Sequence, residues 1–320
     1  MIRQLAHKLV GTPLFVNPIY RNLYYRRVRS KVKGITKPRS LMIEMTSRCN
    51  MACLFCFRSK LTRPSGIIDD GLYKKIIFQA VNWGIDNINL QGFGEPLLDP
   101  NLTEKIAYAK KAGIKEVTCV TNGSLLNLGM AESLITAGLD ALGISIDAAT
   151  SETYKKIHGG GNEAFYNLIC NLRGIDLYKT KYNSLIPRIS MFFRKNSINN
   201  KEEKSFINQF KKYGDTVVLQ QLFKWVGTDV IGNVPQKNRV QFPCYFLWDS
   251  IIINWDGQVV ACCQDFNAKF PIGDIKSQTL REVWDSPKLN LIRDKHLAGV
   301  FTGLCKACDM NTQYVSPWWF

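Results

Sequence analysis

Short apolar runs alternate with segments of helical spacing between residue 41 and about residue 219. The apolar runs predict six strands, at Leu41–Met45, Asn87–Leu90, Glu116–Val120, Ala141–Ile146, Arg188–Phe193 and Thr216–Leu219. Helical spacing is found around 71–83, 101–112, 128–138, 162–178 and 201–213. Such alternation predicts βαβ units, right-handed crossovers and a parallel sheet, so the expected fold class is α/β. In that architecture the chemistry lies at the carboxyl ends of the strands.

The alternation stops after Trp225. Residues 227–239 contain Gly, Pro and Asn, which indicates a loop, and we place a domain boundary there. The expected parts are an N-terminal arm (1–40), an α/β domain (41–226) and a small C-terminal domain (240–320). In the last of these, residues 251–263 predict a β-hairpin that turns at Asp256-Gly257, followed by a helix from about Leu280 to His296.

Composition indicates the cellular setting. The 320 residues are 46% apolar and 21% charged, as in an ordinary globular protein. The ten cysteines occur mostly in groups, which favours metal ligation over a disulfide framework and a reducing compartment such as the cytoplasm. No apolar run approaches the roughly 18 residues that would span a bilayer.

The net charge of +16 is concentrated in the N-terminal arm. Residues 1–40 contain ten Lys or Arg and no Asp or Glu. Such an arm fits attachment to an anionic membrane surface, binding to nucleic acid, or packing on its own domain. If the arm has a partner, we expect the membrane surface rather than nucleic acid. The protein would then be cytoplasmic and membrane-associated.

Three cysteines follow the first predicted strand: Cys49, Cys53 and Cys56. Apart from His7, no other Cys or His lies within sixty residues on either side. Thiolate is the ligand that iron–sulfur clusters prefer, and a four-iron cluster with three thiolates would keep one iron open. A structural zinc site is less suited because it needs a closed set of four ligands. Three unrelated buried cysteines are a further alternative.

The segment Cys49-x3-Cys53-x2-Cys56, with Phe55 before the last Cys, resembles the signature of the radical S-adenosylmethionine (SAM) enzymes. The resemblance implies a partial (β/α)6 parallel barrel and a [4Fe–4S] cluster held by these three thiolates. It also implies that SAM binds the open iron and is cleaved to a 5′-deoxyadenosyl radical. The electron would come from a donor such as flavodoxin or ferredoxin.

Further segments resemble the SAM-binding motifs of that family. Gly92-Phe93-Gly94-Glu95 resembles its Gly-Gly-Glu motif, in which Gly94 and Glu95 would approach the SAM ammonium. Ser145 ends the fourth strand, and Arg194 and Asn196 follow the fifth, near the expected SAM carboxylate and ribose. His158, where relatives usually have Arg, is interpreted as a surface substitution or a substrate contact. The isolated Cys119 and Cys170 are expected in the core.

A second cysteine group consists of Cys244, Cys262, Cys305 and Cys308. On geometry alone a closed set of four favours zinc. The order and spacing resemble the SPASM domain or its shortened twitch form, which implies an auxiliary [4Fe–4S] cluster in a small C-terminal iron–sulfur domain. Cys263 lies beside Cys262, and strand alternation would point it away from that cluster. Cys263 would then be a packed residue or a catalytic hydrogen-atom donor.

The resemblance leads to one main functional prediction. The chain is predicted to be a radical SAM enzyme that abstracts hydrogen from a C–H bond of a small molecule. A carbohydrate or aminocyclitol is the expected substrate, with epimerisation or dehydrogenation as the outcome. One alternative is a peptide-modifying radical SAM maturase. The alternative from another class is a non-catalytic, zinc-containing nucleic-acid-binding protein.

Overall fold

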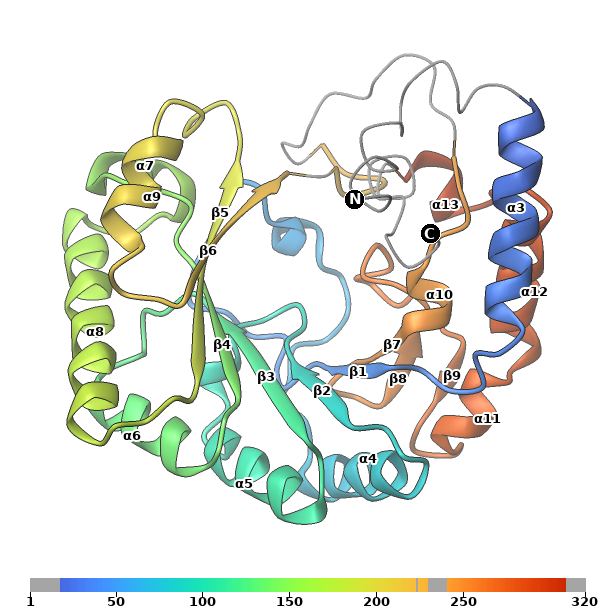
Figure 1. The fold of residues 1–320 in the computed structure, drawn as a ribbon, viewed down its shortest axis with the longest axis horizontal. Helices are drawn as coiled ribbons and strands as arrows, with labels where there is room; N and C mark the ends of the chain where they lie inside the picture. Colours follow the sequence, from blue (N-terminus) through green and yellow to red (C-terminus); the bar gives the residue numbers. More distant parts are fainter. Residues whose placement is uncertain (1–17, 223, 230–240, 309–320) are drawn as a thin grey trace.

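The computed structural model describes residues 18–222, 224–229 and 241–308. Its nine-stranded sheet has the order β6-β5-β4-β3-β2-β1-β7-β8-β9 (Figure 1). The strands are β1 (Ser40–Ile43), β2 (Asn87–Leu90), β3 (Glu116–Thr121), β4 (Ala141–Ser145), β5 (Arg188–Lys195), β6 (Thr216–Gln221), β7 (Ser250–Ile253), β8 (Gln258–Val260) and β9 (Gly273–Asp274). All pairs from β1 to β6 are parallel. The six predicted strands and their parallel pairing are therefore confirmed.

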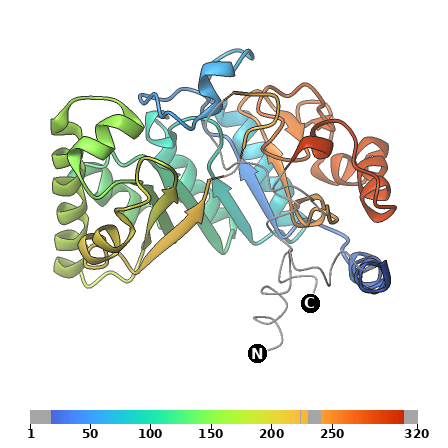
Figure 2. The ribbon, with the colours of Figure 1, turned by 90° about the horizontal axis from the view of Figure 1, so that it is seen from above.

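Helices cover one face of this curved sheet (Figures 1 and 2). They are α4 (Asp70–Asn82), α5 (Leu102–Ala112), α6 (Leu128–Thr136), α7 (Ser151–His158), α8 (Asn162–Lys181) and α9 (Glu203–Phe210). The short helices η1 (Phe57–Lys60) and η2 (Pro96–Leu98) follow the cysteine loop and the Gly94-Glu95 segment. The sheet does not close, so the prediction of a partial parallel barrel is confirmed.

The two faces of the sheet differ in burial. Strands β2 and β3 alternate between partly exposed and fully buried residues along their whole length. The buried residues, such as Ile88 and Val117, face the helices, whereas Asn89 and Thr118 face the concave side. The side chains on the concave side are therefore less buried than those that face the helices.

The C-terminal hairpin continues the same sheet. β7 pairs in parallel with β1, and β8 pairs antiparallel with β7. The predicted hairpin is confirmed, and Gly257 in its turn has φ +90°, which favours glycine. The predicted division into three domains stays a prediction. β1 and β7 lie on opposite sides of the boundary proposed at residues 227–239, yet they belong to one sheet.

The helix expected from Leu280 to His296 is wrong as one element. The structure has two helices, α11 (Leu280–Trp284) and α12 (Pro287–Leu297), with short helices α10 (Phe246–Asp249) and α13 (Leu304–Ala307) nearby. Ser286 accepts a hydrogen bond from the Leu289 N–H and begins α12, and Pro287 occupies its first turn. The Ser-Pro pair therefore separates the two helices.

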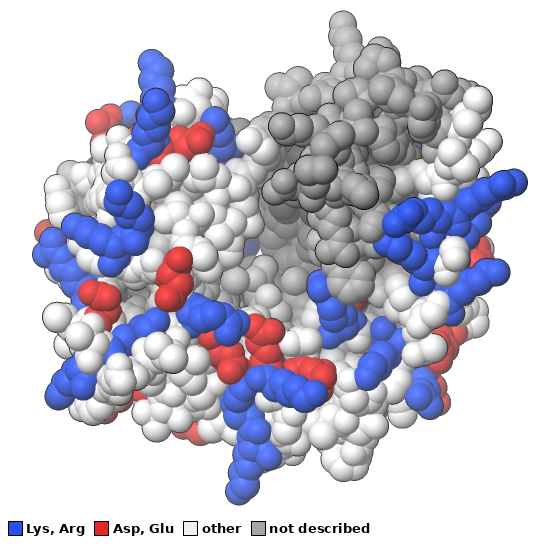
Figure 3. All heavy atoms as spheres, in the orientation of Figure 1, with Lys and Arg blue, Asp and Glu red and all other residues white. Residues whose placement is uncertain are grey.

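The described part of the N-terminal arm is helix α3 (Pro18–Val32), which lies beside α12 (Figure 1). Tyr24, Tyr25 and Val28 are buried, and the Tyr24 ring packs edge-on against Phe242 at 5.1 Å. This packing supports the alternative in which the arm packs on the rest of its own protein. Figure 3 shows Lys and Arg side chains along the same edge of the molecule. Residues 1–17 lie outside the description.

The two isolated cysteines differ. Cys119 is 1% exposed on β3, as expected for a core residue. Cys170 on α8 is exposed, so its placement in the core is wrong. The helical spacing of α8 brings Leu168 and Leu172 into the core, while Cys170 lies between them on another face. Within the described ranges no helix is long and apolar enough to cross a membrane.

Candidate functional site

The loop with Cys49, Cys53 and Cys56 begins at the carboxyl end of β1. Its base is fixed by residues 66–68: the Thr46 hydroxyl donates to the Gly66 carbonyl at 2.7 Å, and the Gly66 N–H donates to Ser47 Oγ at 3.0 Å. Farther along, the Leu54 N–H donates to the Ile157 carbonyl at the end of α7. The loop is therefore held from both sides of the barrel mouth.

The three thiols lie together and are partly buried. Burial raises the pKa of the Cys53 thiol, and the neighbouring Cys56, Asp147 and Cys49 raise it further. Burial also raises the pKa of Cys56. No group of three or more His, Cys, Asp or Glu in the described residues is arranged around one metal ion. Thiolates spaced around a multi-iron cluster lie farther apart, and the all-sulfur donor set fits such a cluster.

Gly94 is required by the cysteine loop itself. A Cβ built on Gly94 would lie closer than 3.0 Å to the carbonyl oxygens of Thr46 and Arg48. The next residue, Glu95, donates its backbone N–H to the Arg48 carbonyl at 2.8 Å. The sequence prediction gave Gly94 close approach to a ligand, whereas in the structure the close neighbour is the backbone of the cysteine loop.

Glu95 is 2% exposed and its carboxylate already accepts three hydrogen bonds. The donors are the Thr121 hydroxyl at 2.6 Å and the backbone N–H groups of Asn122 and Leu97 at 2.7 and 3.1 Å. Burial raises the pKa of Glu95, while these hydrogen bonds lower it. Glu95 therefore connects the turns that follow β2 and β3, which are next to the cysteine loop.

Arg194 at the end of β5 joins the other predicted SAM contacts. Its Nη1 donates to Ser145 Oγ at 3.0 Å, and its guanidinium carbon lies 6.0 Å from the centre of the Phe55 ring. Asp147, which is fully buried, accepts the Arg194 backbone N–H at 2.6 Å. The structure thus brings Phe55, Ser145 and Arg194 together.

Asn196 is mainly engaged in its own turn. Its Oδ1 accepts the Ile198 N–H at 2.8 Å, and its Nδ2 donates to the Arg194 carbonyl at 3.0 Å. The adjacent Asn199 is fully buried and donates to the Asp147 and Arg194 carbonyls. These bonds position the chain after β5, so the closest observed role of Asn196 is to hold Arg194 in place.

His158 is buried, so its interpretation as a surface substitution is wrong. Only 3% of the residue is exposed. Its Nδ1 lies 3.0 Å from Cys53 Sγ, and its Nε2 lies 2.9 Å from the Ile146 carbonyl oxygen and 3.5 Å from Asp147 Oδ2. Because a carbonyl oxygen only accepts, Nε2 carries a proton and Nδ1 faces the thiol. The sequence placed His158 correctly at the end of α7 but gave no sign of this contact.

The C-terminal cysteines also gather in one place. Burial raises the pKa of Cys262 well above its ordinary value, with further contributions from the neighbouring Cys263, Cys305 and Cys244. Burial and the neighbouring Cys308 raise the pKa of Cys305 to about 11. The Gln241 side chain donates to the Cys305 carbonyl at 2.7 Å, which ties the two ends of the group together.

Strand alternation does not fix the orientation of Cys263, so the expectation that it points away from the other C-terminal thiols stays a prediction. Strand β8 ends at Val260, so Cys262 and Cys263 lie in a turn where strand alternation does not apply. Burial and the neighbouring Cys308 raise the pKa of Cys263 to about 12. Cys263 therefore lies beside the C-terminal thiol group.

An apolar cluster connects the two thiol groups. Its buried members are Phe57, Phe93, Ile252, Val260 and Phe266, and both Cys56 and Cys263 pack against it. Trp225 also packs there, with its ring 4.4 Å from Phe57, and it donates its indole N–H to the Phe55 carbonyl at 3.0 Å. The side chains between Cys56 and Cys263 are thus mostly aromatic or aliphatic.

Sequence reasoning missed a buried ion pair beside this cluster. Arg63 pairs with Glu44, whose side chain is fully buried, and Arg63 Nε donates to the Phe266 carbonyl at 2.7 Å. Glu44 also accepts the backbone N–H groups of Phe93 and Trp255. The available signal was a charged residue within the apolar run Leu41–Met45.

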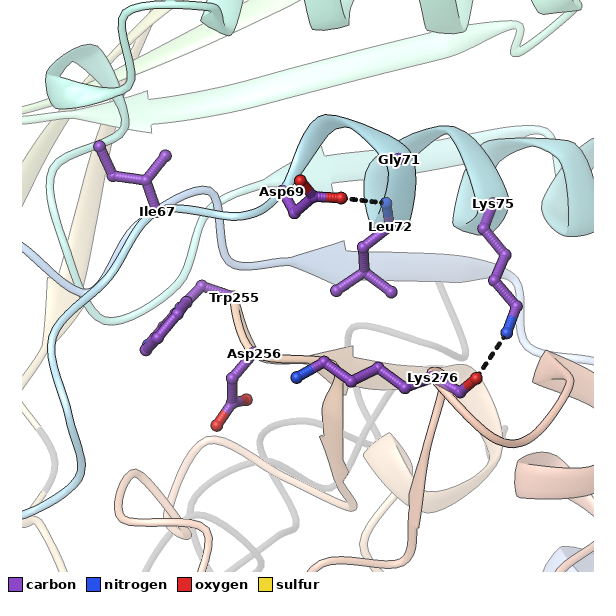
Figure 4. Close-up of a pocket in the computed structure, with 8 residues that line it drawn as sticks. All are labelled: Ile67, Asp69, Gly71, Leu72, Lys75, Trp255, Asp256 and Lys276. Atoms are coloured by element: carbon purple, nitrogen blue, oxygen red, sulfur yellow. Dashed lines mark hydrogen bonds between the residues drawn. The ribbon is translucent and has the colours of Figure 1, made fainter.

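A separate pocket lies between the N-terminal end of α4 and the hairpin turn (Figure 4). Its volume is about 380 Å³. The lining residues are Ile67, Asp69, Gly71, Leu72, Lys75, Trp255, Asp256 and Lys276. None of the predicted site residues lines it, so this pocket is distinct from the candidate site.

Comparison with known proteins identifies two domains. Residues 43–188 match the family model of the radical SAM superfamily, and residues 244–309 match the SPASM model of an iron–sulfur cluster-binding domain. The chain is 36% identical over 125 residues to a probable GTP 3′,8-cyclase of Methanococcus maripaludis, covering 39% of this chain and 41% of that protein. It thus spans about two fifths of the length of that relative.

Solved structures share the fold over most of the chain. The crystal structure of BtrN in complex with AdoMet and 2-DOIA has a TM-score of 0.59 at 20% identity, covering 88% of this chain and 98% of BtrN. Native anSMEcpe with bound AdoMet and Cp18Cys peptide has a TM-score of 0.62 at 17% identity, covering 87% of this chain and 91% of anSMEcpe. At these identities the likeness concerns the fold.

Proposed function

The chain belongs to the radical SAM superfamily and has a C-terminal SPASM domain, and from that premise we propose that it modifies a small polyhydroxylated molecule. Proteins with these two domains use SAM and [4Fe–4S] clusters. The two matches support an enzyme over the zinc-containing nucleic-acid-binding alternative. The observation that carries the substrate proposal is the set of uncharged polar side chains on the concave face of the sheet, Asn89, Thr118 and Ser190.

Cys49, Cys53 and Cys56 would hold the SAM-binding cluster, and Cys244, Cys262, Cys305 and Cys308 the auxiliary one. Bound there, the first cluster and SAM supply a 5′-deoxyadenosyl radical that abstracts hydrogen from a C–H bond. The thiol spacing on one loop and the absence of a fourth cysteine from it support this assignment.

The protein's own groups would bind and orient SAM. Arg194 carries a positive charge beside Ser145 and Phe55, which suits a carboxylate lying against the Phe55 ring. Asp147 accepts from the Arg194 backbone and limits its movement. Glu95 would act through the turns that it joins, because its oxygens are occupied by internal donors. Gly94 would contribute by letting the backbone of the cysteine loop pack closely against the segment that follows β2.

A carbohydrate or aminocyclitol substrate is supported by the concave face of the sheet. Uncharged polar side chains, among them Asn89, Thr118 and Ser190, lie there and are partly exposed. Such side chains hydrogen-bond hydroxyl groups without demanding a charge. Epimerisation and dehydrogenation both begin with hydrogen abstraction, and a peptide substrate is the alternative favoured by the fold likeness to anSMEcpe with its bound peptide.

Cys263 would decide between epimerisation and dehydrogenation. It packs against the apolar cluster that faces the candidate site and is close to the auxiliary thiols. Its S–H could give a hydrogen atom to a substrate carbon radical, which is the last step of an epimerisation. The resulting thiyl radical would be reduced by an electron donor such as flavodoxin or ferredoxin and would take up a proton.

The outer face of α3 would contact an anionic membrane surface. Ile19 and Leu23 are 68% and 56% exposed on this helix, and Arg26 and Arg27 are exposed one turn later. Exposed apolar side chains next to cations are typical of helices that bind in the headgroup region. Because the opposite face is packed in the core, α3 would present this face without leaving its domain.

The test is SAM cleavage by a variant in which Cys49, Cys53 and Cys56 are all replaced by Ala. Anaerobically reconstituted protein is incubated with SAM and dithionite, and 5′-deoxyadenosine is measured. We expect the product to disappear while iron bound at the C-terminal cysteines remains. Formation of 5′-deoxyadenosine at the wild-type rate would overturn the assignment.

A further inference from the structure

Trp225 joins the cysteine loop to the C-terminal part of the chain. It lies in the segment 224–229, which follows β6 along the chain. Its indole N–H donates to the Phe55 carbonyl at 3.0 Å, and its ring centre lies 4.4 Å from that of Phe57 and 6.0 Å from that of Phe266. One side chain thus holds the Phe55 backbone through a directional bond and packs its ring against residues from both parts of the chain.

Gln264 holds the segment 224–229 from the C-terminal side. It is 3% exposed. Its Oε1 accepts the Val226 N–H at 2.8 Å, and its Nε2 donates to the Lys224 carbonyl at 3.2 Å. These two bonds fix the residues immediately before and after Trp225. Breaking either bond would leave a buried amide group without a partner, so the position of the Trp225 backbone is well defined.

The far end of the segment 224–229 is attached more weakly. The Thr228 hydroxyl donates to the Trp225 carbonyl at 2.9 Å, and Asp229 forms an ion pair with Lys60 of η1 at 2.9 Å. Both charged side chains are exposed to solvent, so this ion pair contributes little to the attachment. The segment therefore meets the cysteine loop mainly through Trp225.

Phe55 is the residue through which this attachment reaches the proposed SAM site. Its ring is partly exposed, lies 6.0 Å from the Arg194 guanidinium carbon and meets His158 edge-on at 6.1 Å. The Leu54 N–H donates to the Ile157 carbonyl at 2.8 Å, at the end of α7. The backbone of the cysteine loop is therefore tied to α7 at one residue and to the indole N–H at the next.

We propose that Trp225 is a positioning residue for SAM binding, which acts by holding Phe55 beside Arg194. This rests on the SAM site of the proposed function, which it deepens by naming the group that orients the aromatic side of that site. Without the indole N–H, the loop around Phe55 would adopt several orientations, and SAM would bind only the fraction that is correctly oriented. Bound SAM selects that orientation, so the affinity for SAM should fall while the cleavage of bound SAM keeps its rate.

The test compares two substitutions of Trp225 in the anaerobically reconstituted protein. Trp225→Phe keeps an apolar ring but removes the N–H group. Trp225→His keeps an N–H group at the same ring position, Nε2, but removes the second ring and its packing. The dissociation constant of SAM is measured by isothermal titration calorimetry at about pH 8, where the introduced imidazole is neutral. The two variants thus separate the hydrogen bond from the packing.

Trp225→Phe should bind SAM about fivefold more weakly than the wild type, which is the effect of losing one net hydrogen bond. Trp225→His should stay within about twofold of the wild type. Trp83→Phe is the matched control and should bind SAM like the wild type, because Trp83 lies at the far end of α4 from the cysteine loop and packs edge-on against Trp284 at 6.5 Å. Weaker binding by Trp225→His than by Trp225→Phe, or wild-type binding by both, would overturn the proposal.

Two further readouts separate the positioning of SAM from support of the fold. Trp225→Phe should retain the iron and sulfide content of the wild type. In dithionite-driven formation of 5′-deoxyadenosine its KM for SAM should rise about fivefold, whereas kcat should stay within about twofold. Loss of iron from both Trp225 variants would assign the residue to the fold, and a fall in kcat without a rise in KM would assign it to the chemical step. Either result would overturn the proposal.

The proposed SAM site can fail separately. Arg194→Gln removes the charge that this site offers to the SAM carboxylate, so it should weaken SAM binding at least about tenfold. If Arg194→Gln binds SAM like the wild type, the proposed SAM site is refuted, and the role of Trp225 is refuted with it. If Arg194→Gln binds weakly and Trp225→Phe binds like the wild type, the SAM site stands and only the role of Trp225 is overturned.

Discussion

Replacement of Gly94 by Ala should displace the cysteine loop. The added Cβ would meet the carbonyl oxygens of Thr46 and Arg48 and would lie 2.9 Å from the Ser47 carbonyl carbon. All three neighbours are backbone atoms, so no side-chain rotation can relieve the clash. The Glu95 N–H bond to the Arg48 carbonyl holds the two segments together, so they cannot separate without losing it.

The size of the effect follows from the cost of overpacking. An extra methyl group in a packed site lowers the free energy of unfolding by about 1–3 kcal/mol. A clash with backbone atoms belongs at the upper end of that range, about 3 kcal/mol. With an unfolding entropy of about 2.1 cal/mol/K per residue, a 320-residue chain loses about 4–5 °C in melting temperature. The displaced loop should also hold less iron and sulfide after reconstitution.

The assay is calorimetry of the apo-protein together with iron and sulfide analysis of the reconstituted protein. Gly34→Ala is the control, because a Cβ there would meet only the Lys31 carbonyl oxygen, at 4.0 Å. This control should stay within about 1 °C of the wild type. If Gly94→Ala has the same melting temperature as Gly34→Ala and binds as much iron as the wild type, Gly94 is not needed for the close approach of the two backbone segments.

Two further predictions concern the thiol beside the auxiliary group and the arm. Cys263→Ala should keep both iron complements and form 5′-deoxyadenosine, yet release substrate whose stereocentre is not inverted; inversion at the wild-type rate would remove the donor role. Deleting the arm would also delete core residues such as Tyr24, so its charge is tested with the double substitution Arg26→Gln and Arg27→Gln. The double variant should bind anionic liposomes about thirtyfold more weakly at low salt, because each arginine near the surface contributes about 1 kcal/mol, and an equal affinity in the sedimentation assay would exclude a membrane role for these arginines.

The parallel sheet could be predicted because its local patterns agree with its burial. Residues of β3 alternate between a face covered by helices and a partly exposed concave face, and the sequence already alternates there. The cysteine spacing was equally local, since Cys49, Cys53 and Cys56 lie within eight residues of each other. Features set by a few neighbouring residues were therefore accessible to sequence reasoning.

Errors and untested predictions arose where a local rule was applied beyond its element. Cys263 was assigned an orientation from strand alternation, but β8 ends three residues earlier. The prediction of one helix from about Leu280 to His296 overlooks Ser286-Pro287. An N-cap residue followed by Pro is a known signal for the start of a helix. Cys170 lies between core residues of α8 and is exposed. In each case the missing information was the limit or the orientation of an element.

Long-range partners were beyond local patterns altogether, and Glu44 is the clearest case. It contacts groups 19, 49 and 211 residues away: Arg63, the Phe93 N–H and the Trp255 N–H. A buried charge is expensive unless paired and hydrogen-bonded, so Glu44 requires all of these partners in place. Arg63 in turn donates to the Phe266 carbonyl, beyond Cys263. One carboxylate thus fixes the loop after Cys56 against the hairpin that precedes Cys262, and thereby sets how the two thiol groups face each other across the apolar cluster.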